Sequence, residues 1–186
     1  CETACINQGN VVIEEAIVPT KGLQQLDKAL SGATGTVILS VGNNHFGGRT
    51  SAVTVVSRLV EGKFPPYADV IPRDCTFRAV IDRQAFQSAF KRCALVTTKG
   101  SQSIRMHFQD GALTLSTRSS EGSAEETLGC DFSAEEQVIG FNPEFFLDAL
   151  PVLTGESVVF EWSGKATPGK ITEGSYAYVV MPVSIE

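Results

Sequence analysis

The sequence predicts an α+β fold in which one design, a helix followed by antiparallel strands, occurs three times. In each copy a short β run leads through a capping-type residue into an amphipathic helix, and the helices are expected over residues 20–30, 83–96 and 143–153. The residues before them, Pro19, Asp82 and Asn142, are 63 and 60 residues apart. This near-constant spacing indicates a repeated supersecondary unit. Because each unit also contains several strands, it favours pseudo-symmetric α+β domains over a solenoid.

The helix assignments rest on capping and on apolar spacing. Proline, aspartate and asparagine all suit the first positions of a helix. In the first helix Leu23, Leu26 and Leu30 fall on one face, as the buried side chains of an amphipathic helix do. The corresponding stripe of the second helix is Phe86, Phe90 and Cys93.

Alternation of apolar and polar residues predicts the strands between the helices. Ile104, Met106 and Phe108 alternate with Arg105 and His107, which places one face of that strand in a core and the other in water. Similar runs predict strands over residues 36–41, 52–59, 112–117, 126–132, 158–162 and 176–183. Turn-forming residues separate them at 42–44, 109–111 and 121–123, and residues 164–170 are expected to form a hairpin turn.

A proline-rich segment divides the chain. Residues 61–67 contain two prolines and one glycine, which is typical of an extended linker. One repeat precedes this linker and two follow it. If a complete domain needs two repeats, residues 1–60 form half of a domain with one helix, and residues 61–72 connect the parts. Residues 73–186 then form a complete domain with two helices on one face of two antiparallel sheets.

Composition limits the classes of protein to consider. Hydrophobic residues make up 42% of the chain and charged residues 19%, so the chain is expected to bury a real core. No apolar run approaches the roughly 18–20 residues of a membrane span, and no signal peptide is recognised, so a cytoplasmic protein is expected. The net charge of −6 argues against a protein that grips phosphates over its whole surface, although it permits a locally basic face.

The five cysteines are expected to be reduced thiols. Their odd number and scattered positions argue against a disulfide framework, and no CxxC pair suggests structural zinc. Cys93 and Cys130 are expected in a core.

The polar faces of the first two helices lack acidic residues, although the chain as a whole is acidic. The first face carries Lys21, Gln24, Gln25 and Lys28. The second carries Gln84, Gln87, Ser88 and Lys91, flanked by Arg83 and Arg92. Two interpretations remain open: ordinary solvated helix faces, or surfaces that face a polyanion. The third helix differs because it carries Glu144 and Asp148.

Four segments resemble bacterial DNA sliding clamps, the β subunit family of DNA polymerase III. Residues 57–72 (SRLVEGKFPPYADVIP) are similar to the junction between the second and third clamp domains. Residues 17–23 (IVPTKGL) resemble a helix start in the middle domain, and residues 139–142 (IGFN) and 178–183 (YVVMPV) resemble last-domain signatures. The resemblance covers nearly all of the chain after about residue 15. It implies that the chain begins midway through the middle domain.

The clamp resemblance implies a non-enzymatic ring with helices on its inner face and sheets on its outer face. Such a ring is a head-to-tail homodimer that encircles duplex DNA without sequence readout. The two acid-free helix faces, with Arg83 and Arg92, would then face the DNA. The implied partners are duplex DNA, the polymerase III alpha subunit, the clamp loader and other proteins with a clamp-binding motif.

The resemblance also implies a cleft that takes a peptide with apolar anchors. The matching positions are Pro65, Val70, Asn142, Phe145, Val179, Val180, Met181, Pro182 and Val183. Proline, valine and methionine make an adaptable apolar groove, and the Asn142 side chain suits a peptide amide. The alternative for Phe145 and Val180 is simple core packing. Asp69 stands where many clamps have a basic residue, so acidic peptide residues are expected to be tolerated less well.

Subunit contacts are implied at two places. Leu95 and Val96 match the helix end that packs on the next subunit, and Glu125 and Glu126 match an acidic strand at that boundary. The alternative is that Leu95 belongs to the core and that the glutamates are only solvated.

The sequence offers little support for an enzyme. His45 and His107 are the only histidines, neither has a metal-ligand spacing, and no GxSxG, HExxH or Walker motif occurs. No catalytic residue, metal or cofactor is therefore expected. The alternative to a sliding clamp is a protein-interaction domain of clamp-like fold without a DNA role.

Overall fold

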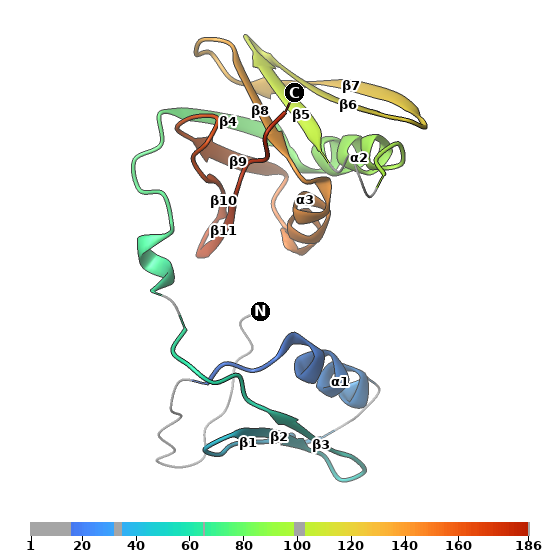
Figure 1. The fold of residues 1–186 in the computed structure, drawn as a ribbon, viewed down its shortest axis with the longest axis vertical. Helices are drawn as coiled ribbons and strands as arrows, with labels where there is room; N and C mark the ends of the chain where they lie inside the picture. Colours follow the sequence, from blue (N-terminus) through green and yellow to red (C-terminus); the bar gives the residue numbers. More distant parts are fainter. Residues whose placement is uncertain (1–15, 32–34, 65, 99–102, 186) are drawn as a thin grey trace. The chain divides into compact units, whose positions relative to one another are not determined.

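The computed structural model describes residues 16–31, 35–64, 66–98 and 103–185. The chain divides between Tyr67 and Ala68 into two compact units, called unit 1 and unit 2 below (Figure 1). This division lies inside the segment expected to be a linker. The linker segment contains a short 3₁₀ helix, η1 (Tyr67–Asp69).

In its described residues, unit 1 consists of one helix packed on a small antiparallel sheet. The helix is α1 (Thr20–Leu30), and the strands β1 (Ile38–Val41), β2 (His45–Arg49) and β3 (Thr54–Arg58) follow in sequence order across the sheet. Gly22 approaches the side chain of Ser57 so closely that an added Cβ would lie 2.5 Å from its Oγ. Leu26 packs in the same way on Gly48. Glycine at these two positions therefore lets the helix settle on the strands.

Unit 2 contains an antiparallel sheet with two helices and a 3₁₀ turn. The helices are α2 (Arg83–Ala94) and α3 (Pro143–Ala149), and the turn is η2 (Leu150–Val152). The strands are β4 (Phe77–Asp82), β5 (Ile104–Gln109), β6 (Ala112–Ser119), β7 (Gly122–Asp131), β8 (Gln137–Phe141), β9 (Ser157–Trp162), β10 (Gly169–Glu173) and β11 (Tyr176–Val180). Their order across the sheet is β11-β10-β9-β4-β7-β6-β5-β8.

The helix starts agree with the sequence prediction because the capping residues define them. The Oδ1 atom of Asp82 accepts the backbone N–H of Ala85 at 2.7 Å, and that of Asn142 accepts the N–H of Glu144 at 3.0 Å. The first helix ends at Leu30 as expected, whereas the second and third helices end earlier than expected. The Thr97 hydroxyl bonds the carbonyl of Ala94, where α2 stops, and Pro151 cannot continue an α-helix beyond α3.

Two strands were not predicted from the sequence. β2 contains two adjacent glycines and therefore shows no alternation of apolar side chains. β10 begins within residues 164–170, which were expected to form only a turn. The turn itself is present, since the Thr167 hydroxyl donates to the carbonyl of Gly164 at 3.0 Å.

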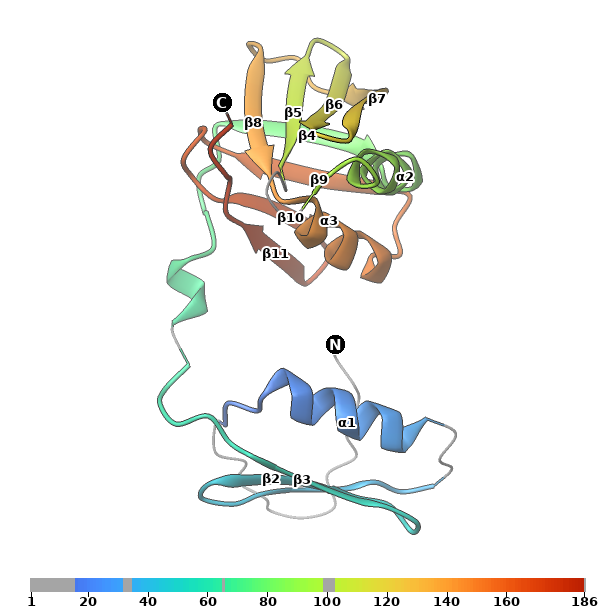
Figure 2. The same cartoon turned by 45° about the vertical axis from the view of Figure 1, so that its right-hand side comes forward.

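The sheet of unit 2 is continuous and curled. The two sheets expected from the sequence are joined where β4 pairs with the end of β7, through Val80 with Asp131 and Ile81 with Cys130. After β11, at one edge of the sheet, the chain reaches β8, at the other edge, where the N–H of Val183 donates to the carbonyl of Gly140 at 2.8 Å. Three residues span at most about 11 Å. The end of β11 therefore lies close to β8, and Figure 2 shows the C-terminal segment running from β11 towards β8.

Aromatic side chains fill the space between the helices and the curled sheet. Phe90 of α2 stacks on Phe146 of α3 with ring centroids 4.5 Å apart, and both rings are fully buried. On the strands, Phe108 and Trp162 lie 4.4 Å apart. The predicted apolar stripe of the second helix is therefore confirmed. Cys93 is buried as expected, whereas Cys130 is only half-buried against this core.

Candidate functional site

The last residues of unit 2 form a segment that we call the terminal strap, residues 181–185. It follows directly from β11, where Val180 is 3% exposed and belongs to the core. Core packing therefore accounts for Val180, as the alternative interpretation allowed. Met181 is 56% exposed, and Pro182 and Val183 are half-buried. Met181 is therefore an exposed apolar side chain, whereas the two residues that follow it are partly covered.

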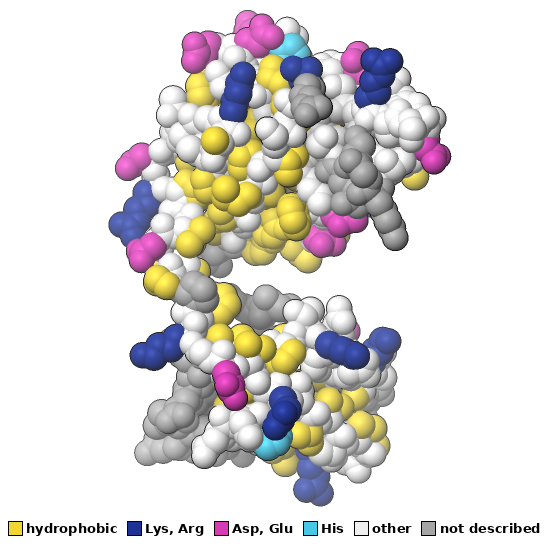
Figure 3. All heavy atoms as spheres, in the orientation of Figure 1, with side chains coloured by type: hydrophobic (Ala, Val, Ile, Leu, Met, Phe, Trp, Pro, Cys, Tyr) yellow, Lys and Arg dark blue, Asp and Glu magenta, His cyan; other side chains and the backbone are white. Residues whose placement is uncertain are grey.

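Helix α3 contributes two further predicted residues. Phe145 is 42% exposed, so core packing does not account for it. Asn142 uses its side-chain oxygen to cap the helix, which leaves its NH₂ group as the part that can donate to a peptide. The pKa of Tyr178, on β11, is raised by burial and by the nearby charge of Asp148 on α3. Asp148 on α3 is therefore close enough to Tyr178 on β11 for its charge to act there, and Figure 3 shows hydrophobic side chains gathered over this part of unit 2.

Val70 lies on a segment that is fastened to β9 and β10. Its side chain is 55% exposed and lines a depression together with Pro168. The Nζ atom of Lys170 donates to the carbonyl of Pro72 at 3.1 Å and forms an ion pair with Glu161 at 3.1 Å. Lys170 also pairs with Val179 of β11, so the segment is held near the start of the strap. Pro65, the remaining predicted peptide-binding residue, lies outside the described residues.

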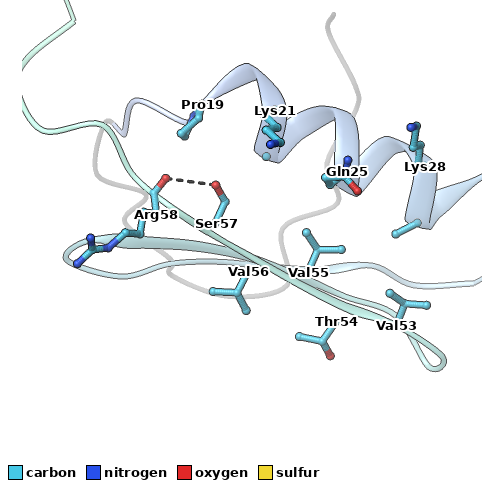
Figure 4. Close-up of a pocket in the computed structure, with 12 residues that line it drawn as sticks. Pro19, Lys21, Gln25, Lys28, Val53, Thr54, Val55, Val56, Ser57 and Arg58 are labelled. Atoms are coloured by element: carbon cyan, nitrogen blue, oxygen red, sulfur yellow. Dashed lines mark hydrogen bonds between the residues drawn. The ribbon is translucent and has the colours of Figure 1, made fainter.

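The predicted DNA-facing residues of α1 are all exposed. Figure 4 shows Lys21, Gln25 and Lys28 along one side of the helix, above Val53 and Val55 of the sheet. These residues line an open groove between α1 and β3. Gln24 is exposed as well. The surface is polar and weakly basic on the helix side, whereas the strand side combines valines with Thr54, Ser57 and Arg58.

The polar face of α2 is more constrained than its sequence suggested. Gln84, Lys91 and the flanking Arg92 are exposed, and Gln87 is half-buried. Arg92 makes a two-point ion pair with Glu126 of β7, at 2.6 Å and 2.8 Å, which lowers the pKa of that carboxyl group. The Arg83 Nε donates to the carbonyl of Gly155 at 2.7 Å. Both arginines are therefore engaged within the chain, which leaves the lysines as the principal cations of these faces.

The residues predicted at a subunit boundary lie around the end of α2 and along β7. Leu95 is 84% exposed, which rules out the alternative that it belongs to the core, and Val96 is half-buried. Glu125 is exposed, while Glu126 holds Arg92. Among the described residues, β7 pairs with β6 from Gly122 to Gly129 but with β4 only through Cys130 and Asp131. Most of the second edge of β7 therefore has no strand beside it.

Three side chains with structural roles at these surfaces escaped the sequence analysis. Lys170 holds the Val70 segment, and Ser163 supports it by donating to the carbonyl of Asp74 at 3.1 Å. Glu173 accepts the backbone N–H groups of Thr154 and Gly155, which lowers the pKa of its carboxyl group. Their partners are 18 to 98 residues away in the chain, so no local pattern could have revealed them.

The part of the chain that the structure describes contains neither a membrane-spanning helix nor a metal-binding cluster. None of its helices is long and apolar enough to cross a membrane. Within the same residues, no group of three or more histidine, cysteine, aspartate or glutamate side chains is placed to hold a metal ion.

Comparison with known sequences places both units in one protein family. Residues 68–184 match the C-terminal domain of the DNA polymerase III beta subunit, and residues 1–66 match its central domain. The chain is 34% identical over 175 residues to the beta sliding clamp of Pseudomonas putida, covering 92% of this chain and 48% of that protein. The chain thus spans about half the length of the curated relatives it matches.

Solved structures show the same fold. The polymerase III beta protein of Caulobacter crescentus superposes with a TM-score of 0.84 at 29% identity, covering 96% of this chain and 49% of that one. A sliding clamp from Pseudomonas aeruginosa, solved bound to griselimycin, gives a TM-score of 0.78 at 33% identity, covering 91% of this chain and 47% of that one. The α+β clamp fold expected from the repeat and the resemblance is thereby confirmed.

Proposed function

Because the chain belongs to the DNA polymerase III beta subunit family, we propose that it is part of a DNA sliding clamp. Such a clamp is a non-enzymatic processivity factor of the cytoplasm that encircles duplex DNA and tethers the replicative polymerase. In this proposal residues 1–60 belong to the central clamp domain, residues 61–72 are the linker, and residues 73–186 form the C-terminal domain. The match of both units, in order, to two successive domains of one family supports it.

The observation that carries the peptide-tethering role is the exposed apolar surface at the end of unit 2. Met181 and Phe145 are exposed although both are large and apolar, and Pro182 and Val183 continue this surface. An exposed group of this kind, edged by a polar amide such as that of Asn142, is typical of a site for a short peptide with apolar anchors. We infer that the polymerase alpha subunit, the clamp loader and griselimycin all contact this surface.

The chain's two methionines allow a direct test, since Met106 is fully buried and Met181 is on the strap. A peptide from the C-terminus of the polymerase is added to protein labelled with ¹³C at the methionine methyl groups. The Met181 signal is expected to move and the Met106 signal to stay. Met181→Ala is expected to weaken binding by roughly 1–2 kcal/mol, because it removes an exposed anchor. A Met181 signal that stays in place when the peptide is added would refute the site.

DNA is proposed to be held by enclosure, with the lysines of α1 and α2 nearest to the phosphates. The net charge of −6 and the internal pairing of Arg83 and Arg92 both argue for weak direct binding. Loading of a full-length clamp on circular DNA distinguishes this role from that of an interaction domain without DNA. Retention on nicked circles with loss on linear DNA supports enclosure, and equal loss from both contradicts it.

A further inference from the structure

Gly140 is buried on the side of its strand that faces away from the core. Its neighbours in β8, Ile139 and Phe141, are 1% and 0% exposed and point into the core, so Gly140 lies on the opposite face of the sheet. That face is covered at Gly140 by the terminal strap. A Cβ added there would overlap the side chain of Ile185 and lie 3.0 Å from the carbonyl oxygen of Val183.

The strap is therefore attached at two points. At its start, Val180 is paired in register with Gly169 and packed in the core. At its end, Val183 makes its backbone hydrogen bond to Gly140, and Ile185 rests on the bare backbone of that glycine. Between these points lie only Met181 and Pro182. Their backbone is fixed from both sides, across the gap between the two edges of the curled sheet.

We propose that Gly140 and Ile185 are positioning residues of the peptide-binding surface. They contact no peptide in this proposal. Instead, the packing of Ile185 on Gly140 restrains the backbone at Met181, so that the Met181 side chain is already ordered when a peptide binds. The inference rests on the proposed peptide-tethering function and adds two residues to it.

The physical basis is pre-organisation. A segment that is ordered before binding loses less conformational freedom when the ligand arrives. After β11 the strap is irregular apart from the single bridge between Val183 and Gly140. Ile185 is half-buried. On one side its side chain packs on the backbone of Gly140, and on the other it lines a shallow polar depression with Arg105 and Ser116.

The test compares four chains, each labelled at its methionine methyl groups and titrated with griselimycin. The chains are the wild type, Ile185→Ser, the conservative Ile185→Val, and Ser184→Ala, which changes an exposed neighbour on the same strap. Ile185→Ser is expected to weaken griselimycin binding about 10-fold, because the strap end is released. In that variant the Met181 signal should sharpen and move towards the position of a mobile side chain, while the Met106 signal stays. Ile185→Val and Ser184→Ala should behave as the wild type does.

Gly140→Ala gives an independent check from the other side of the contact. The added methyl group occupies the seat of Ile185, so the Met181 signal should change as it does in Ile185→Ser. Wild-type affinity in Ile185→Ser, an unmoved Met181 signal, or equal changes at Met106 and Met181 would each overturn the positioning role. If the wild type itself binds neither griselimycin nor the polymerase peptide, the proposed function fails, whereas the methyl signals of the free variants still decide whether the seat orders the strap.

Discussion

Glu173 shows how one side chain can order a loop that is distant in sequence. Its carboxylate receives the N–H groups of Thr154 and Gly155, in the loop that leads from η2 to β9. The same loop is held from the other side by the Arg83 guanidinium, which donates to the carbonyl of Gly155. The loop is thus fixed between β10 and the first turn of α2.

This arrangement predicts a pH-dependent contribution to stability. The two N–H groups favour the carboxylate, so the pKa of Glu173 in the folded chain lies below its ordinary value of 4.5. A lowered pKa stabilises the folded state above pH 4.5, and that contribution is lost as the pH falls through the folded-state pKa. Glu173→Gln should therefore be less stable than the wild type at pH 7, and the difference should shrink in acid. Urea unfolding followed by the fluorescence of the single tryptophan, Trp162, measures it.

The matched control is Glu135→Gln, which removes an exposed carboxylate from the turn before β8. Its stability should follow that of the wild type at each pH. A difference between wild type and Glu173→Gln that stays constant from pH 7 into acid would show that the charge is not the source.

For single residues, the sequence predicted the exposure of side chains better than their hydrogen-bond and ion-pair partners. Helical spacing correctly placed Phe86 and Phe90 inside and Lys91 outside, because burial follows the period of the helix. It could not show that Arg92 pairs with Glu126 or that Arg83 bonds Gly155, since these partners are 34 and 72 residues away. Two of the cations assigned to DNA are therefore occupied within the chain.

Among the elements, α1 and α2 carry the proposed DNA contacts. Lys28→Glu combined with Lys91→Glu, in a full-length clamp, should shorten retention on nicked circular DNA several-fold. Each phosphate contact that is lost should also reduce the salt slope of DNA binding by about 0.9. Griselimycin affinity should be unchanged, because both lysines lie outside the strap and α3. Lys165→Glu, in the exposed turn before β10, reverses one lysine charge away from the helices and serves as the control.

If the double variant and the Lys165 control were retained equally on DNA, α1 and α2 would not form the DNA-facing surface. Loss of the dimer in the double variant would instead show that the helix faces form the subunit contact.

The elements that the sequence predicted well are those with local signals. Helix starts follow from Asp82 and Asn142, whose side chains cap the first turn. β5 and β9 follow from strict alternation, which the burial of their residues reproduces. β2 was missed because Gly47 and Gly48 give no side-chain pattern. The joining of two expected sheets into one depends on two residue pairs between β4 and β7, which no local pattern encodes.

For the whole molecule, the exposed end of α2 is the proposed subunit contact. Leu95→Ala with Val96→Ala in a full-length clamp should weaken the dimer and open the ring, because Leu95 is large, apolar and 84% exposed. Sedimentation velocity over a range of protein concentrations measures the dimer equilibrium. Phe145→Ala, which removes an apolar side chain exposed on α3, should leave the dimer intact while weakening peptide binding. A double variant that remains dimeric at every concentration would exclude this contact.

The three-fold repeat made the overall organisation predictable from the sequence. Evenly spaced helix starts and one proline-rich segment between the first and second repeats indicated more than one part, and the family resemblance supplied the architecture. The closure of the curled sheet was not predictable, because it depends on Val183 meeting Gly140 across 43 residues. A repeat in the sequence reveals the repeated structural units. The contact between Val183 and Gly140 is not part of the repeat, so the repeat could not reveal it.

The unpaired edge of β7 also bears on which partner strand this molecule accepts. An open strand edge can recruit any extended chain, and such recruitment commonly ends in aggregation. Here the edge carries the exposed carboxylate of Glu125, because that of Glu126 is paired with Arg92, so antiparallel pairing of β7 with its own copy around Glu125 would bring acidic side chains close together. Like charges on facing strands repel, whereas a basic strand would be attracted. The charge at this edge therefore disfavours pairing of β7 with a second β7. It favours an assembly in which β7 pairs with a different strand.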